Sequence, residues 1–174
     1  GNGQGKQVDG GVLGPVRVER VAESRLPSVD LANLTFGSVF TDHMLTLTYD
    51  DGAWGDPAVV PYGPLSLEPG VMTFHYSQSL FEGLKAYRDR DGAIRLFRPD
   101  LNARRMHESC EFLAIPPLPE GGFEAALAAY LAVDAAWVPS LPDHALYLRP
   151  IVFSIEPHLD VRPSTRYLFV VIGS

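Results

Sequence analysis

Alternating hydrophobic and polar positions predict β-strands along much of the chain after residue 43. MLTLTY and AVVPY, separated by a Gly-rich break, predict an antiparallel pair at 44–49 and 58–62. LKAYR and AIRLF flank Asp89–Gly92, where Asp-Gly supplies the positive backbone angle that a hairpin turn needs. The β-branched and aromatic stretches HALYLRPIVFSI and TRYLFVVI predict two more strands, at 144–155 and 165–172.

Apolar residues at helical spacing predict two helices between these strands. The first opens at Pro99 and Asp100, which suit a first helical turn, and runs to about Leu113. The second runs from Phe123 to Trp137, where Pro139 ends it. The residues expected to face the core are Leu101, Met106, Cys110 and Leu113 in the first helix, and Phe123, Leu127, Tyr130, Leu131 and Trp137 in the second. Because hairpins replace repeated strand-helix-strand units, we expect an α+β fold, a mainly antiparallel sheet with flanking helices.

The chain divides into an N-terminal arm and one domain. Residues 1–30 mix Gly, Pro, Val and charged residues without a sustained period, which predicts a mobile tail followed by an extended arm. Residues 31–174 predict a small domain of a size that buries a real core. The chain starts without methionine, and its last strand runs into Gly173 and Ser174. We therefore expect a segment of a longer protein, with this strand leading toward a C-terminal domain.

Composition and charge argue against several classes of function. Hydrophobic residues make up 46% and charged residues 20% of the chain, as in ordinary globular domains. With 21 acidic and 14 basic residues the net charge is −7, which repels a nucleic acid backbone. No apolar run reaches the roughly 18 residues of a membrane span, and the first residues lack the apolar stretch of a secretion signal. We therefore expect a cytoplasmic protein that binds neither nucleic acid nor membranes.

Cysteine and histidine give no sign of a disulfide or a metal site. Cys110 is the lone cysteine, which excludes an internal disulfide and is typical of a buried small hydrophobe. The five histidines are scattered, and none is spaced with carboxylates as metal ligands are. We expect no bound metal.

The basic residues are better candidates for a functional site than the cysteine and the histidines. Of the 14 basic residues, two are lysines: Lys6 in the predicted tail and Lys85 on a hairpin strand. Arg105, on the first helix, fits either a solvated surface or an anion ligand at the edge of the apolar stripe. Arg149 lies in the apolar stretch LYLRP, where an unpaired charge is costly, and Tyr147 points to the same strand face. This pair predicts a carboxylate pocket with an aromatic wall, although from the residues alone a structural role is equally open.

Six segments, in a fixed order, carry a resemblance to a known family. They are FGSVFTDHM at 36–44, HYSQSLFEGLKAYR at 75–88, LFRPDLNARRM at 96–106, VDAAWVP at 133–139, LYLRP at 146–150 and EPHLDVRP at 156–163. In this order they resemble the branched-chain aminotransferases, which are pyridoxal-phosphate enzymes of fold type IV. The resemblance covers residues 36 to about 172 and implies the small N-terminal domain of such an enzyme.

The resemblance gives each matched residue an expected role. Arg105 falls where the family binds the phosphate of pyridoxal 5'-phosphate. Tyr76 falls where a tyrosine reaches from one subunit into the site of the other and contacts the substrate carboxylate, which implies a homodimer. Arg149 matches a position suited to the distal carboxylate of glutamate or 2-oxoglutarate. The residues expected in the walls of the side-chain pocket are Phe36, Phe81 and Tyr147, and those expected in a loop offered across the dimer interface are Leu159 and Val161.

The resemblance also implies chemistry outside this segment. The lysine that carries the cofactor is expected C-terminal to Ser174, in a cofactor domain, so we expect no catalytic residue in residues 1–174 and no activity from this segment alone. Lys85 matches a family lysine with another role. Asp160 departs from the family, which has glycine at this place in the interface loop.

The implied activity is transfer of the amino group of Leu, Ile or Val to 2-oxoglutarate, which yields the corresponding 2-oxo acids and glutamate. One alternative is another fold-type IV enzyme, a D-amino-acid transaminase or an aminodeoxychorismate lyase, although LYLRP and FEGLKAY favour the branched-chain enzyme. The other alternative is a truncated, non-catalytic module that dimerises or binds an acid.

Overall fold

The fold is built on one ten-stranded mixed sheet, seen in a computed structural model that describes residues 7–174. The main path through the sheet runs β1-β2-β5-β3-β10-β9-β7-β8, with β4 paired to β3 and β6 paired to β9. The strands are β1 (Gln7–Asp9), β2 (Pro15–Val18), β3 (His43–Asp50), β4 (Ala53–Trp54), β5 (Ala58–Pro61), β6 (Ser79–Phe81), β7 (Leu84–Arg88), β8 (Ile94–Leu96), β9 (Leu146–Ser154) and β10 (Tyr167–Gly173). The β2–β5 pair is parallel and the other pairs are antiparallel, so the expected α+β fold with a mainly antiparallel sheet is confirmed.

The strand pairs expected from the alternating pattern are present. β3 pairs with β5, and β7 forms a hairpin with β8. The two strands expected at 144–155 and 165–172 are β9 and β10, and the structure adds that they pair with each other. Gly92, in the hairpin turn, has a φ of 82°, the positive angle for which the Asp-Gly pair was expected. The two-residue strand β4 lies inside the Gly-rich break and was not expected from the sequence.

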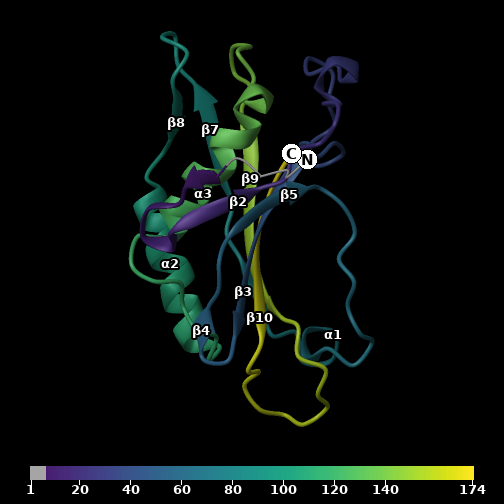
Figure 1. Cartoon of the computed structure of the whole chain (residues 1–174). Helices are drawn as coiled ribbons and strands as arrows, with labels where there is room; N and C mark the ends of the chain where they lie inside the picture. The colour runs from purple at the N-terminus through teal and green to yellow at the C-terminus, as the bar shows by residue number, and fades with distance from the viewer. Residues whose placement is uncertain (1–6) are drawn as a thin grey trace, which may run out of the picture.

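Two long helices cover one face of the sheet. They are α2 (Pro99–Phe112) and α3 (Gly122–Asp134), the latter extended by the 3-10 helix η3 (Ala135–Trp137). Figure 1 shows α2 and α3 together on one side of the long central strands, with the short helix α1 (Met72–Tyr76) apart from them. No helix within residues 7–174 has the length and apolar character needed to cross a membrane.

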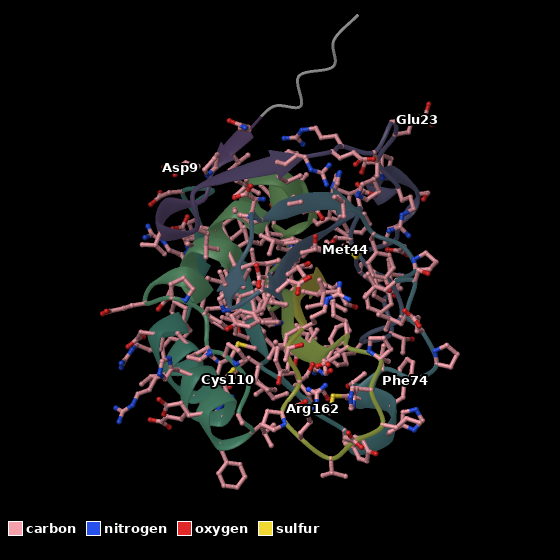
Figure 2. All side chains as sticks on the ribbon, turned by 60° about the horizontal axis from the view of Figure 1, so that its bottom comes forward. Asp9, Glu23, Met44, Phe74, Cys110 and Arg162 are labelled. Atoms are coloured by element: carbon pink, nitrogen blue, oxygen red, sulfur yellow. The ribbon has the colours of Figure 1, made fainter. Side chains whose placement is uncertain are left out.

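The helix faces follow the predicted stripes with one exception. All five residues expected to face inward from the second helix are buried, and in α2 so are Met106 and Cys110. Figure 2 shows the side chain of Cys110, a residue of α2, in the layer between this helix and the sheet. Leu101 was expected inside but is 51% exposed, so that part of the prediction is wrong. Leu101 precedes Met106 by five residues, which at about 100° per residue turns it roughly 140° away from Met106 and onto the exposed side of α2.

The N-terminal arm joins the sheet. β1 and β2 pair with each other, and β2 lies beside β5, so the arm adds two strands at one edge. Two short 3-10 helices, η1 (Gly11–Leu13) and η2 (Leu26–Ser28), interrupt it. Val16 and Val18 of β2 are buried in the main core. The first part of the predicted tail, with Lys6, lies outside the described residues.

The two faces of the sheet differ in how well they are covered. The large core lies between the sheet and α2, α3 and the arm. The smaller cluster on Met44, Phe153 and Val170 lies apart from this core and is packed by residues that stay partly exposed, among them Ile151 and Ile172. This second cluster borders the candidate site.

Candidate functional site

Four of the expected site residues come together around β9. Arg149 lies over the ring of Phe81, with its guanidinium carbon 4.1 Å from the ring centroid, and donates from Nη2 to the hydroxyl of Tyr147 at 2.8 Å. The ring of Phe36 meets that of Tyr147 edge-on, with 5.1 Å between centroids. The strand period explains the pairing of Tyr147 and Arg149, because residues two apart on β9 share a face. The arrangement is a cationic group beside two aromatic rings, with the ring of Phe36 packed against one of them.

The guanidinium of Arg149 is incompletely satisfied. Its Nε is buried and has no hydrogen-bond partner among the described residues, while its described side-chain hydrogen bond goes to the neutral hydroxyl of Tyr147. A partly buried cation gains most from a carboxylate, whose two oxygens match the guanidinium fork. The group is therefore arranged to receive an anion beside apolar walls.

A break between β6 and β7 makes room for this group. Both strands pair with β9, and between them the backbone N–H of Glu82 donates to the carbonyl of Pro150. Pro150 has no N–H to donate in return, which interrupts the ladder at this point. At Gly83 a β-carbon would lie 2.1 Å from the Tyr147 hydroxyl, so glycine is needed for Tyr147 to reach its place.

Tyr76, Leu159 and Val161 form a second group, at the end of the molecule near α1. The Tyr76 hydroxyl donates to the backbone carbonyl of Leu159. Leu159 is 64% and Val161 84% exposed, so the loop presents two apolar side chains to its surroundings. Apolar side chains presented together from one loop are typical of a contact surface.

Glu156 holds this loop in shape. Its carboxylate accepts hydrogen bonds from both terminal nitrogens of Arg162, from the Ser164 hydroxyl and from the Thr165 N–H. The Arg162 hydrogen bond is the main cause that lowers the pKa of Glu156 to about 2. In Figure 2, Arg162 lies in this loop, with Phe74 of α1 at the same end. The charged base of the loop fixes the exposed turn that carries Leu159 and Val161.

Arg105 lies on α2 and contacts a different acidic residue. Its Nε and Nη2 donate to the two oxygens of Glu82 at 2.6 and 2.7 Å, and the Asn102 amide donates to the same carboxylate at 2.8 Å. Burial alone would raise the pKa of the Glu82 carboxyl, but the hydrogen bonds from Arg105 and Asn102 outweigh it and the pKa lies below its ordinary value. The described contacts of Arg105 do not reach the Arg149 group or the Tyr76 group.

Sequence reasoning missed Glu82, Gly83 and Glu156, although each organises a residue that it did select. A signal for Glu82 was present, because SLFEGL places a carboxylate inside an apolar stretch, where a buried charge needs a partner. Lys85 is exposed on β7, directly opposite Tyr147 on β9. Within residues 7–174, no group of three or more His, Cys, Asp and Glu side chains is placed to hold a metal ion.

The sequence matches curated branched-chain enzymes. It is 49% identical over 141 residues to the "Branched-chain-amino-acid aminotransferase" of Mycobacterium tuberculosis (strain ATCC 25618 / H37Rv), which covers 80% of this chain and 38% of that protein. It is 44% identical over 146 residues to "Branched-chain-amino-acid transaminase 1" of Bacillus subtilis (strain 168), covering 83% of this chain and 41% of that protein. The chain thus spans about two fifths of the length of these relatives. No protein-family model matches the chain.

Solved structures share the fold. A branched-chain amino acid aminotransferase from T.th., complexed with N-(5'-phosphopyridoxyl)-L-glutamate, superposes with a TM-score of 0.54 at 22% identity, over 72% of this chain and 39% of that one. The enzyme from Thermoproteus uzoniensis with norvaline gives a TM-score of 0.53 at 19% identity, over 75% of this chain and 40% of that one. At these identities the solved structures show a shared fold, whereas the similarity in sequence is shown by the curated relatives. In sequence and in fold, the chain matches the N-terminal part of the branched-chain-amino-acid aminotransferases.

Proposed function

We propose that the protein containing this chain transfers the amino group of Leu, Ile or Val to 2-oxoglutarate with the help of pyridoxal phosphate. The observation that carries the proposal is the Arg149 group. Its guanidinium has an Nε without a partner among the described residues and lies against the rings of Phe81 and Tyr147, and the ring of Phe36 packs against that of Tyr147 as a third aromatic wall. Residues 31–174 are the small domain in this proposal, and the lysine that carries the cofactor belongs to a domain C-terminal to it.

One site then serves two kinds of substrate. The rings of Phe36, Phe81 and Tyr147 suit a branched aliphatic side chain, because an apolar pocket favours a ligand that buries apolar surface. The Arg149 fork suits the distal carboxylate of glutamate and 2-oxoglutarate. Since Tyr147 contributes to both features, the apolar and acidic substrates bind to neighbouring parts of one pocket.

Arg105 is suited to the cofactor phosphate. A guanidinium carries five N–H donors, and Glu82 occupies the edge formed by Nε and Nη2. The outer edge, on a side chain that is 67% exposed, retains donors for phosphate oxygens. The bound cofactor supplies the electron sink for removal of the Cα proton, and these residues of the chain hold its phosphate and the substrate.

A homodimer is part of the proposal. Leu159 and Val161 are exposed, and Tyr76 is fixed beside them by the carbonyl of Leu159. In a dimer these side chains lie against the partner's pocket, where Tyr76 contacts the substrate carboxylate.

A cytoplasmic location is also proposed, and fractionation of the cells that make the protein tests it.

The test is a coupled transamination assay with the full-length protein across L- and D-amino acids. We expect activity with Leu, Ile and Val when 2-oxoglutarate is the acceptor, and glutamate as the product. Strong activity with D-alanine and none with leucine would reject the specificity and leave the fold-type IV alternatives. A full-length protein that binds pyridoxal phosphate but catalyses no transfer would reject the activity.

A further inference from the structure

We propose that Asp42 is a positioning residue for the substrate side-chain pocket. Its buried carboxylate ties the N-terminal arm to the start of β3. This tie holds the 29–39 loop, which places Phe36 on Tyr147. This inference rests on the proposed function for its catalytic consequence. The geometry that supports it is independent of the cofactor.

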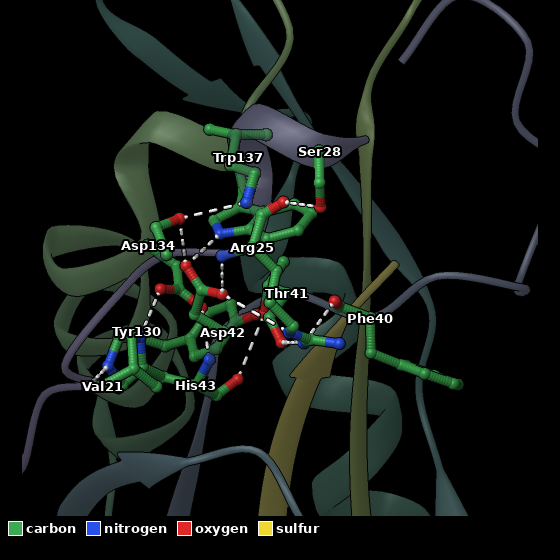
Figure 3. Close-up of polar contacts among 12 residues, drawn as sticks. Val21, Arg25, Ser28, Phe40, Thr41, Asp42, His43, Tyr130, Asp134 and Trp137 are labelled. Carbon is green, nitrogen blue, oxygen red and sulfur yellow. Dashed lines mark hydrogen bonds and ion pairs between the residues drawn. The ribbon is translucent and has the colours of Figure 1, made fainter. Parts of the chain in front are cut away.

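Asp42 accepts hydrogen bonds from three residues in two separate segments. Its carboxylate accepts hydrogen bonds from the Ser24 hydroxyl at 2.5 Å and the Arg25 N–H at 3.0 Å, both in the arm, and from the Trp137 indole N–H at 2.9 Å, after α3. The Asp42 side chain is 5% exposed. Figure 3 shows Asp42 between Arg25 and Trp137, with the hydrogen bonds converging on it.

The partners of Asp42 require a carboxylate. All three are hydrogen-bond donors, and a carboxylate offers acceptors alone, whereas an asparagine amide would turn a donor toward one of them. The pKa of Asp42 is lowered overall, since the hydrogen bonds from Ser24, Arg25 and Trp137 outweigh burial, which by itself would raise the pKa. The cluster is therefore built around the charged form of Asp42.

Further contacts join residues 21–25 of the arm to residues 40–43 at the start of β3, and these two segments together form the junction. Nη2 of Arg25 donates to the backbone carbonyls of Phe40 and Thr41 at 2.9 and 2.7 Å. Nε2 of His43 accepts from the Val21 N–H at 3.0 Å, while Nδ1 of His43 lies 2.6 Å from the Asp134 carboxylate of α3. Residues 21–25 and 40–43 are thus joined side by side and fastened to α3 (Figure 3).

The middle of the loop between the joined segments carries little packing of its own, whereas Val29 and Val39 at its ends pack against the main core. Residues 32–38 are exposed, and Phe36 is 74% exposed even though its ring contacts Tyr147. The loop lines one side of a cavity of about 500 Å³ whose other walls include Lys85, Trp137 and Tyr147. Because Phe36 buries too little surface to fix the loop, its position is set at its two ends, by the junction and by the packing of Val29 and Val39 on the core. Joining the two ends also reduces the number of conformations open to the loop.

Asp42→Asn in the full-length protein tests the proposal, and Glu23→Gln is the matched control. Glu23 is an exposed carboxylate on the same arm, with no described hydrogen bond or ion pair. We expect Asp42→Asn to raise the KM for leucine by about fivefold or more, with a smaller change in kcat, since one charge-assisted hydrogen-bond set is disturbed. Glu23→Gln should leave both constants unchanged.

Two further readouts separate positioning from a general loss of stability. Hydrogen exchange of the amides at 29–39 should accelerate in Asp42→Asn, while the amides of β9 and β10 stay protected. In a Phe36→Ala background, Asp42→Asn should add little to the leucine KM, because the residue that it positions is gone. Faster exchange throughout the sheet, or an equal effect of Asp42→Asn with and without Phe36, overturns the proposal.

The outcome also distinguishes this inference from the proposed function. If the parent protein does not transaminate leucine, the proposed function fails, and hydrogen exchange of the 29–39 loop still decides whether Asp42 holds that loop. If the parent is active and exchange in the loop is the same in Asp42→Asn, the positioning role is wrong while the activity stands.

Discussion

Glu82 and Arg105 form a contact in which the anion is buried and the cation is exposed. The Glu82 residue is 3% exposed, whereas 67% of the Arg105 side chain is exposed. An exposed ion pair between two mobile side chains contributes little to stability. Here one partner is fixed by burial and by Asn102, so the contact sets the direction of the Arg105 guanidinium.

We expect Arg105→Gln to weaken pyridoxal phosphate binding by the full-length protein by about tenfold or more, since hydrogen bonds to charged groups contribute roughly 1.5 to 3 kcal/mol. Arg105→Lys should recover part of the affinity, because it keeps the charge and loses the planar fork. Absorbance titration of the cofactor-free protein measures both. An unchanged dissociation constant in Arg105→Gln would return Arg105 to a surface role.

Glu82→Gln should weaken cofactor binding less than Arg105→Gln does, by about threefold, because the amide keeps one acceptor for Arg105 but loses the charge-assisted pair. In the Arg105→Gln background the same change should have no further effect on the dissociation constant. The measurement is a double-mutant cycle of cofactor titrations. Tighter binding in Glu82→Gln would mean that the Glu82 charge competes with the phosphate.

Arg149→Met should separate the two substrate classes. Methionine keeps the apolar volume beside Phe81 but cannot pair with a carboxylate, so the KM for 2-oxoglutarate should rise by about tenfold or more. The half-reaction with leucine should change by less than about threefold, because its side chain meets the aromatic walls. Single-turnover kinetics of each half-reaction give both values. Equal losses for leucine and 2-oxoglutarate would contradict the division of roles.

Gly83→Ala should displace Tyr147 and disturb the pocket. The added β-carbon would lie 2.1 Å from the Tyr147 hydroxyl, and overpacking of this kind costs about 1 to 3 kcal/mol. Gly63→Ala is the matched control, since a β-carbon there meets nothing within 4 Å. A lower Tm and a higher KM for leucine are expected in Gly83→Ala alone. Identical behaviour of the two variants would show that the chain adapts at Gly83 without moving Tyr147.

The loop held by Glu156 should resist mild acid. Because the folded pKa of Glu156, about 2, lies below its ordinary value of 4.5, its stabilisation is complete above about pH 4.5 and is lost as the pH falls toward 2. Proteolysis by pepsin across this range should therefore spare residues 157–165 near pH 4 and cut there near pH 2. Glu156→Gln should be cut at both values. A loop cleaved equally at pH 4 and pH 2 in the parent protein would argue against this role for Glu156.

The sequence was most informative where the pattern is local and periodic. The hairpin at Asp89–Gly92 and the inward face of α3 depend on residues a few positions apart, and both are as expected. The parallel β2–β5 pair joins segments about 40 residues apart, and no local period specifies it. Leu101 is a different case, since the helical period itself places it about 140° away from Met106, outside the stripe to which it was assigned.

The site residues expected from the resemblance fall into three groups. Strand β9 organises the Arg149 group, the loop at 157–165 carries Leu159 and Val161 beside Tyr76, and Arg105 stands apart on α2. The strand period of two predicted that Tyr147 and Arg149 share a face, and the hydrogen bond between them confirms it. The partners of the remaining residues come from more distant positions, such as Glu82 for Arg105 and Leu159 for Tyr76. Such pairings are set by tertiary packing and cannot be predicted from local sequence patterns.

The position of β10 has a consequence for how the protein is made. β10, the last strand described, lies between β3 and β9 in the middle of the sheet, in register with both. During synthesis, β3 leaves the ribosome more than a hundred residues before its neighbour exists, so it remains an open edge with buried-type side chains such as Leu45 and Leu47. Residues 167–173 supply the backbone hydrogen bonds that join the strands on the β3 side of the sheet to those on the β9 side. Until β10 is translated, the unpaired β3 edge is therefore open to pairing with other chains.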